Sequence, residues 1–271
     1  MAKVGRGAGV HKDALAQSRR EYEALCELQR VFPQDKRYGT LMPLDYLESA
    51  GNGIVITRYF RGDDLGRLRP LDSSATREAC RSAGIWLRKL HESGDSGTQR
   101  GVLGVADKLA YLASTYGGVL GADAETRKAW ELLAQEAARA EMVAVRWVRL
   151  HGDFKPENML CDGTKYVGLD IDWRNVGAAV YDLAPFLNHL RLVGRVMGRV
   201  RANGLCELAE AEFMAGYGGS VPVYALRWAQ LYFALCYLGS HRAHGRLMAI
   251  YAHLRVRPLV LDLARRLQEA A

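Results

Sequence analysis

The first part of the chain combines a helical pattern with an extended one. Apolar residues three and four positions apart predict an amphipathic helix over 13–32, with Asp13 as the N-cap and Pro33 beyond its end. The apolar face of this helix carries Leu15, Tyr22, Leu25, Leu28 and Val31. After a loop over 33–43, the turn Gly51-Asn52-Gly53 predicts a β-hairpin whose second strand covers 54–60.

Helical periodicity returns after this hairpin. The spacing of Ile85, Trp86, Leu87 and Leu90 predicts a helix from Ser73 to Ser93, which ends before Gly94. Two further helices are expected over about 105–116 and 123–142, separated by Gly117-Gly118.

The segment 145–173 changes back to an extended pattern. The run VRWVRL predicts a strand that leads into the polar loop HGDFKPEN. The runs MLC and KYVGLDI flank Asp162-Gly163 and predict a second hairpin. From about residue 179 onward the pattern is helical, with expected breaks at Gly204, at 216–222 and at Pro258.

Composition fits an ordinary globular protein. The 271 residues are 49% hydrophobic and 25% charged, which is enough to bury a core. A small mixed part followed by a large helical part predicts an α+β protein and argues against a doubly wound sheet. The uncharged stretches 213–226 and 228–240 are too short to span a bilayer, so a transmembrane segment is not expected.

The sequence favours a reducing compartment. The N-terminal residues MAKVGRGAGVHKD lack the apolar segment of a secretory signal. Five cysteines, an odd number, lie far apart without any CxxC motif, which argues against a disulfide framework. We therefore expect reduced thiols and a cytoplasmic location.

The net charge of +7 is concentrated towards the C-terminus. Residues 185–271 contain 11 Arg, no Lys and 5 acidic residues, an excess of 11 − 5 = +6. Such an excess indicates an anionic partner or peripheral contact with a membrane surface, or else a solvated helical face. Nucleic acid is not an expected partner, because the sequence contains no zinc finger or RNA-recognition signature.

The loop HGDFKPEN carries the candidate chemistry. Asp153 and Asn158 lie five residues apart, and Asp170 follows 12 residues later, at the end of the hairpin's return strand. Phosphoryl transfer requires a carboxylate that orients the acceptor hydroxyl and oxygen ligands that hold Mg²⁺ against the nucleotide phosphates. The sequence therefore predicts a magnesium-dependent phosphotransfer site.

The motifs HGDFKPENML, YVGLDIDW and AAVYDLAPF resemble those of the aminoglycoside phosphotransferase and choline kinase-like family, which is related to the protein kinases. The similarity is specific across 149–186, and the order of elements before it agrees. The resemblance implies Asp153 as the catalytic base, Asn158 and a later Asp as Mg²⁺ ligands, and Asp182 as a structural residue. It also implies a two-lobed, protein kinase-like fold that binds ATP.

Two carboxylates compete for the second metal position. Asp172 precedes Trp173 as in a common family motif, whereas Asp170 has the usual separation from Asp182, since 182 − 170 = 12 and 182 − 172 = 10. We favour Asp170 and keep Asp172 as the alternative. Lys155 resembles the lysine of the protein-kinase loop and would stabilise the transferred phosphoryl group. We interpret His151 as an orienting, hydrogen-bonded core residue.

The N-terminal part departs from the family pattern. The expected first strands and glycine-rich loop are not visible, and GRGAG at 5–9 follows the candidate phosphate lysine, Lys3, instead of preceding it. Lys3 would pair with Glu21, or alternatively with Glu23. Either the chain starts downstream of its first strands, or it has an abbreviated nucleotide-binding lobe. We place this lobe at 1–62 and the helical, catalytic lobe at 63–271. The backbone of Arg58, Tyr59 and Phe60 would then meet the adenine.

The expected function is an ATP- and Mg²⁺-dependent small-molecule kinase. The excess positive charge of the C-terminal part favours a sugar or an anionic glycan-type hydroxyl acceptor over a polycationic antibiotic. A non-catalytic pseudokinase, an aminoglycoside kinase and a protein kinase remain alternatives.

Overall fold

The computed structural model describes residues 2–4, 11–32, 35–49, 51–67, 73–93, 100–171, 175–196 and 201–270. Two compact units divide the chain. The first comprises Met1–Gly94, Arg149–Asn175 and Glu212–Gly218, and the second comprises Asp95–Val148, Val176–Ala211 and Gly219–Ala271. The fold is mixed α+β, as expected, and a small β region precedes a mostly helical portion.

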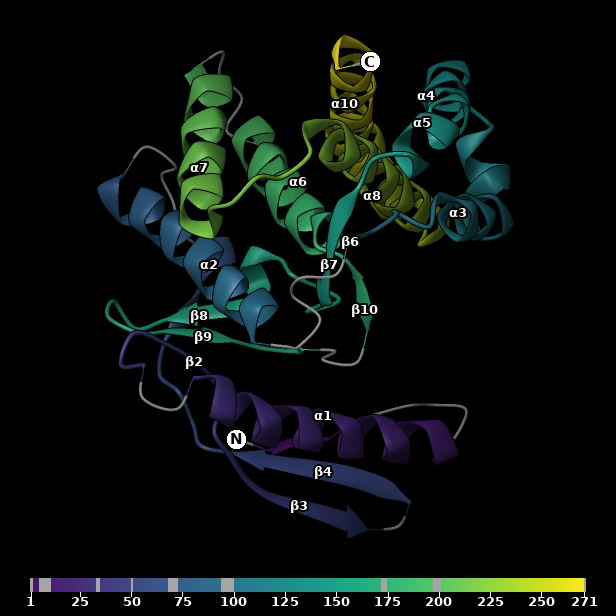
Figure 1. The fold of residues 1–271 in the computed structure, drawn as a ribbon. Helices are drawn as coiled ribbons and strands as arrows, with labels where there is room; N and C mark the ends of the chain where they lie inside the picture. The colour runs from purple at the N-terminus through teal and green to yellow at the C-terminus, as the bar shows by residue number, and fades with distance from the viewer. Residues whose placement is uncertain are drawn as a thin grey trace. The chain divides into compact units, whose positions relative to one another are not determined.

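The first unit begins with a three-stranded antiparallel sheet in the order β1-β4-β3, formed by β1 (Ala2–Val4), β3 (Pro43–Ser49) and β4 (Asn52–Thr57). Helix α1 (His11–Val31) packs along β3 and β4 (Figure 1). Gly53 is required at this contact, because a Cβ atom there would lie 2.6 Å from Ser18 Cβ of α1. The predicted helix and hairpin are both confirmed.

A second sheet connects segments that are far apart in the sequence. Its order is β2-β9-β8-β5, formed by β2 (Tyr38–Thr40), β5 (Asp63–Asp64), β8 (Met159–Cys161) and β9 (Tyr166–Gly168). Strands β8 and β9 form the hairpin predicted around Asp162-Gly163. Strand β2, which pairs in parallel with β9, lies in the stretch expected to be a loop. That prediction was wrong because three residues carry no strand signal of their own and depend on β9 for hydrogen bonds.

Helix α2 (Ser74–Glu92) crosses the end of α7 (Arg201–Tyr217) at backbone contact distance. A Cβ atom at Gly84 would lie 2.1 Å from Phe213 O, and one at Gly216 would lie 2.0 Å from Arg81 O. Gly216 was expected to end a helix, yet it lies inside α7 because the crossing requires a residue without a side chain. Gly204 also lies inside α7, so the break expected there was wrong. A glycine in a helix interior costs only about 1 kcal/mol relative to alanine.

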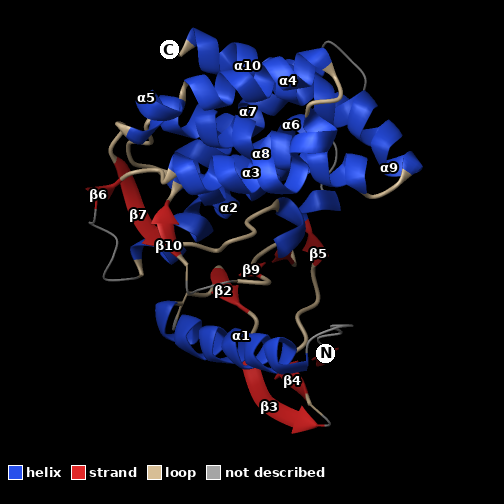
Figure 2. Ribbon diagram, turned by 90° about the vertical axis from the view of Figure 1, so that its right-hand side faces the viewer, coloured by secondary structure: helices blue, strands red, loops and turns tan. Residues whose placement is uncertain are grey.

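The second unit is mainly helical (Figure 2). Its helices are α3 (Val105–Leu120), α4 (Ala124–Gln135), α5 (Ala137–Glu141), α6 (Val180–Val196), α8 (Val223–Ala243), α9 (Arg246–Tyr251), a π-helical segment (Ala252–Val256) and α10 (Arg257–Glu269). Helix α8 packs against α3, α6 and α10. A small sheet in the order β10-β7-β6 joins β6 (Arg100–Gly101), β7 (Val145–Arg149) and β10 (Val176–Ala178).

Three predicted boundaries were wrong, two in helices of the second unit and one in the β3–β4 hairpin of the first. Gly117 and Gly118 lie inside α3, whose last turn is held by the fully buried Leu120. The helix expected over 123–142 is divided at Glu136, whose carboxylate accepts a hydrogen bond from the Tyr224 hydroxyl. The strand expected over 54–60 ends at Thr57, opposite Pro43, which has no N–H to extend the ladder. Pro258 lies at a boundary as expected, in the first turn of α10.

Asp123 joins three helices of the second unit. Its carboxylate caps α4 by accepting hydrogen bonds from the Glu125 N–H and the Thr126 hydroxyl. It also accepts bonds of 2.9 Å from both Arg242 of α8 and Arg257 of α10. Partial burial alone would raise the pKa of Asp123, but hydrogen bonds from Arg257, Thr126 and Arg242 outweigh it and hold the pKa well below its usual range.

We expect Asp123→Asn to lower the free energy of unfolding by about 2 kcal/mol at about pH 7, because two charge-assisted bonds are lost. A depressed carboxyl pKa stabilises the fold fully above the unfolded-state pKa of about 3.9. This stabilisation is lost progressively as the pH falls from that value through the lower folded-state pKa. In urea unfolding, the difference in the free energy of unfolding between wild type and Asp123→Asn should therefore shrink on acidification. Asp107→Asn, which changes an exposed aspartate of α3, serves as the control. If this difference in the free energy of unfolding does not shrink as the pH falls, the depressed pKa of Asp123 is not what stabilises the fold.

All five cysteines are free in the structure. Burial raises the pKa of the Cys80 thiol to about 12. Among the described helices, none combines the length and the apolar character needed to cross a bilayer.

Candidate active site

The polar loop after β7 gathers three of the predicted residues. Lys155 Nζ lies 2.6 Å from Asp153 Oδ2. Asn158 donates from Nδ2 to the main-chain oxygen of Asp153, at 2.8 Å, and to its Oδ2, at 3.1 Å. Asn158 is buried, so its amide holds the loop from the interior side. Asp153 is exposed, so its carboxylate faces solvent.

The hairpin brings Asp170 to the same end. The Leu169 N–H donates a hydrogen bond to Asn158 O at 2.9 Å. Asp170 is the next residue, so it lies close to the loop. Asp170 is exposed and has a φ of 51°, the only non-glycine residue with a positive φ among those described. Left-handed backbone in a non-glycine residue costs free energy and concentrates at functional sites.

The interior side of the loop is aromatic. His151 is fully buried, and its Nδ1 accepts the Asp153 N–H at 3.4 Å. The ring centroid of His151 lies 5.2 Å from that of the buried Phe154. These contacts show that His151 is a buried, hydrogen-bonded residue, and its orienting role stays a prediction.

The residue types at this end of the hairpin suit magnesium. Among the described residues, no three His, Cys, Asp or Glu side chains form a ready-made metal cage. Mg²⁺ commonly takes one or two carboxylates, keeps several waters and binds the phosphates of its substrate. Asp170 and the Oδ1 atom of Asn158, with Asp153 beside them, fit that mode of binding.

The other predicted residues are less closely connected to the loop. Lys3 lies in β1 opposite Val55 of β4, and Glu21 is half-buried on α1. Asp172 lies outside the described residues, as do the residues of GRGAG. Asp182 is buried in the first turn of α6.

The expected hinge is an extended linker after β4. The Arg58 N–H donates to Met42 O at 2.8 Å, Tyr59 is 67% exposed, and Phe60 is half-buried. The exposed Tyr59 side chain takes no part in the core, so it is accessible to a ligand.

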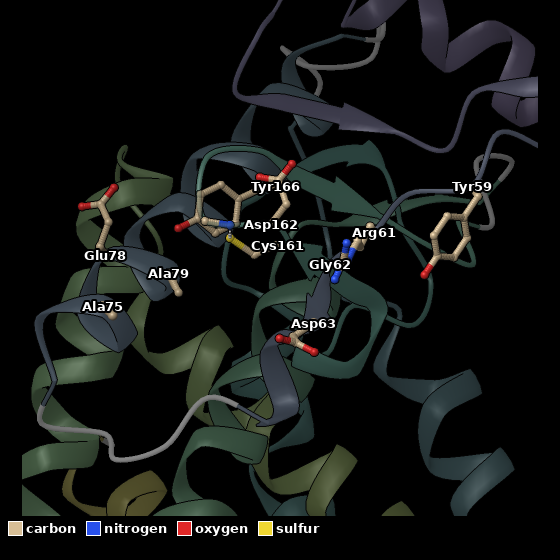
Figure 3. A pocket seen from close by; sticks show the side chains of 11 residues that line it. Tyr59, Arg61, Gly62, Asp63, Ala75, Glu78, Ala79, Cys161, Asp162 and Tyr166 are labelled. Carbon is tan, nitrogen blue, oxygen red and sulfur yellow. Dashed lines mark hydrogen bonds between the residues drawn. The ribbon is translucent and has the colours of Figure 1, made fainter.

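A cavity of about 860 Å³ lies beside this linker, and sequence reasoning did not anticipate it. Figure 3 shows side chains from the linker, from α2 and from the hairpin turn around it, namely Tyr59, Arg61, Asp63, Glu78, Cys161, Asp162 and Tyr166. The hairpin separates it from the loop of Asp153, because Asp162 forms the turn whereas Asn158 and Asp170 flank the open end. Its lining mixes acidic and basic side chains contributed by three distant segments, which no local motif could have indicated.

Comparison with solved structures supports the fold. A glucosamine kinase in complex with glucosamine, ADP and inorganic phosphate has a TM-score of 0.65 at 16% identity, covering 97% of this chain and 71% of that chain. An aminoglycoside-3'-phosphotransferase of type VIII has a TM-score of 0.54 at 20% identity, with 86% and 84% covered. The phosphotransferase APH(3'')-Id from Streptomyces rimosus, in complex with ADP and streptomycin, has a TM-score of 0.55 at 17% identity, with 86% and 85% covered.

At the sequence level, comparison with curated proteins gave no match. The APH family model, described as the phosphotransferase enzyme family, matches residues 8–231. That span covers most of the chain and includes the loop, the hairpin, α6, α7 and the first part of α8. The chain therefore belongs to the APH phosphotransferase enzyme family, whose reaction is phosphoryl transfer to an alcohol group.

Proposed function

We propose that the protein is an ATP- and Mg²⁺-dependent kinase that transfers the γ-phosphate to a hydroxyl group of a small molecule, a sugar being the favoured acceptor. One observation carries this proposal. The Asp153 carboxylate, the Lys155 ammonium and the Asn158 amide meet on one loop, bonded through Leu169 to the segment that presents Asp170.

Each side chain has a distinct role in this proposal. Asp153 orients the acceptor hydroxyl and accepts its proton, which its exposed position allows. Asn158 and Asp170 hold Mg²⁺, which when bound neutralises charge on the phosphates. Lys155, now paired with Asp153, stabilises negative charge on the transferred group.

The nucleotide would lie between the N-terminal sheet and the hairpin. Lys3, paired with Glu21 or Glu23, would contact its phosphates, and the linker backbone from Arg58 to Phe60 would meet the adenine. The solved glucosamine kinase and APH(3'')-Id structures both contain ADP, which supports ATP as the phosphate donor.

The choice of acceptor depends on how much positive charge is available. Five arginines of the C-terminal part each pair with a carboxylate, namely Arg191, Arg242, Arg257, Arg265 and Arg266. Asp123, which lies outside that part of the chain, bonds to two of them, Arg242 and Arg257. Glu210 and Asp262 are already counted in the excess of +6, so only Asp123 and Glu125 lower that excess. An anionic glycan-type acceptor therefore stays favoured on charge, and amino sugars stay the alternative. Relatives that bind glucosamine and streptomycin support a sugar in either case.

Calorimetric titration of ATP with and without Mg²⁺, followed by γ-phosphate transfer to neutral, amino and anionic sugars and to casein, tests this function. We expect magnesium-dependent binding and transfer to at least one free sugar. Nucleotide binding without transfer to any acceptor would favour a pseudokinase. Transfer to casein alone would favour a protein kinase, and absence of nucleotide binding would contradict the proposal.

A further inference from the structure

Four buried aromatic rings form a continuous aromatic column through the first unit, made of Phe32, Trp86, Phe154 and Phe213. Phe32 follows α1 and stacks on Trp86 of α2, with centroids 5.6 Å apart and planes 13° apart. Trp86 stacks on Phe154 of the catalytic loop at 5.8 Å and 2°. Phe154 stacks on Phe213 of α7 at 6.2 Å and 28°. The column thus connects α1 to the loop that carries Asp153.

Trp86 contacts both segments that present the predicted magnesium ligands. Its ring stacks on Phe154, the residue directly after Asp153. Its six-membered ring also lies against Gly168, two residues before Asp170. A Cβ atom at Gly168 would be 2.2 Å from Trp86 Cζ2, so the indole lies directly on the β9 backbone.

A hydrogen bond and a ring contact also hold the indole in place. Its Nε1–H donates to Gly39 O of β2 at 2.7 Å, and β2 pairs with β9. The side chain has no solvent exposure, and the His151 ring meets it edge-on with centroids 5.9 Å apart. A rigid group in contact with both segments defines the distance between them, because close-packed interiors transmit small displacements.

We propose that Trp86 is a positioning residue, which holds the loop of Asp153 and Asn158 and the strand leading to Asp170 at the separation that metal-assisted phosphotransfer requires. This inference rests on the function proposed above. It goes beyond the catalytic motif, because Trp86 lies 67 residues before Asp153 and touches no predicted ligand side chain among those described.

The second unit offers a matched control. Trp228 is also fully buried, donates its indole N–H to Leu133 O at 3.0 Å, and stacks on Tyr232 at 5.8 Å and 4°. Trp86→Phe and Trp228→Phe therefore remove the same chemical group from comparable environments. A purely structural role predicts similar consequences for both variants.

Two measurements on the full chain distinguish the alternatives. Hydrogen exchange should accelerate by about tenfold at amides of 150–159 and 166–171 in Trp86→Phe, but not in Trp228→Phe. Turnover should fall by about tenfold or more in Trp86→Phe, with a higher Mg²⁺ requirement and a KM for ATP within about threefold, because misplacing the reacting groups by about 1 Å is costly. Trp228→Phe should keep wild-type kinetics.

The outcomes separate this inference from the proposed function. Unchanged exchange in these segments, or accelerated exchange with wild-type turnover and Mg²⁺ dependence, would overturn a positioning role. A wild-type protein without kinase activity would refute the proposed function, and the exchange data would still decide whether Trp86 holds the two segments.

A double-mutant cycle with Gly168 gives an independent check. Gly168→Ala should lower turnover strongly in the wild-type background, because its methyl group meets the indole at 2.2 Å. In the Trp86→Phe background, the smaller ring leaves room for that methyl group, so the added loss should be at least about fivefold smaller. Strictly additive losses would show that Gly168 and Trp86 do not act through this contact.

Discussion

Asp153→Asn should lower kcat by about 100-fold or more and leave the fold intact, because the amide cannot accept the proton of the acceptor hydroxyl. The substitution preserves shape and can still accept the hydrogen bond from Asn158 Nδ2. Lys155 loses its ion-pair partner, but both side chains are well exposed, so the effect on the free energy of unfolding should be small. Steady-state kinetics and thermal unfolding of the same preparation would measure both effects.

Glu157→Gln is the matched control for Asp153→Asn. Glu157 is an exposed carboxylate on the same loop, so the control removes the same charge four residues away. Its kcat should stay within about threefold of wild type. If Asp153→Asn also stays within that range, Asp153 has no part in the chemical step.

Substitutions of Asp170 should abolish most magnesium-dependent activity. Asp170→Asn, Asp170→Ala and Asp170→Gly all remove the carboxylate, and we expect each to raise the Mg²⁺ concentration for half-maximal turnover by about tenfold or more. The three variants differ in the free energy that the left-handed backbone requires, because φ is 51° at this position. Alanine pays about 1 kcal/mol for left-handed backbone, whereas glycine and asparagine tolerate it.

Comparing stability with activity separates the two effects. If the carboxylate is a ligand, Asp170→Gly is inactive although it is at least as stable as Asp170→Ala. If only backbone conformation matters, Asp170→Gly keeps its activity. Asp172→Asn tests the alternative ligand. A raised Mg²⁺ requirement in that variant alone, with Asp170 variants unaffected, would reverse the choice made from the spacing to Asp182.

Some of this protein could be predicted from local sequence. The helix over 13–32 and both hairpins follow from patterns of residues that lie only a few positions apart in the sequence. The structure confirms all three. The juxtaposition of Asp153, Lys155 and Asn158 was predictable for the same reason, because six residues on one loop cannot separate far. The family assignment also depends on motifs of this short range.

Glycines show where local reasoning failed. Gly117 and Gly216 were expected to end helices, but both lie inside helices. Gly216 admits the backbone of α2, and Gly117 places its helix close to the Trp130 ring of α4. A glycine that permits close approach has the same sequence signature as a glycine that breaks a helix, and only the partner element distinguishes them.

The sequence by itself therefore determined the α+β class, the phosphotransferase loop and the residue types of its site, since these depend on neighbours along the chain. Tertiary structure alone decided the pairing of β2 with β9, the bonds from Arg242 and Arg257 to Asp123, and the stacking of Trp86 between Phe32 and Phe154. Each of these contacts joins residues dozens of positions apart, and their burial and hydrogen bonding exist only once the chain has packed.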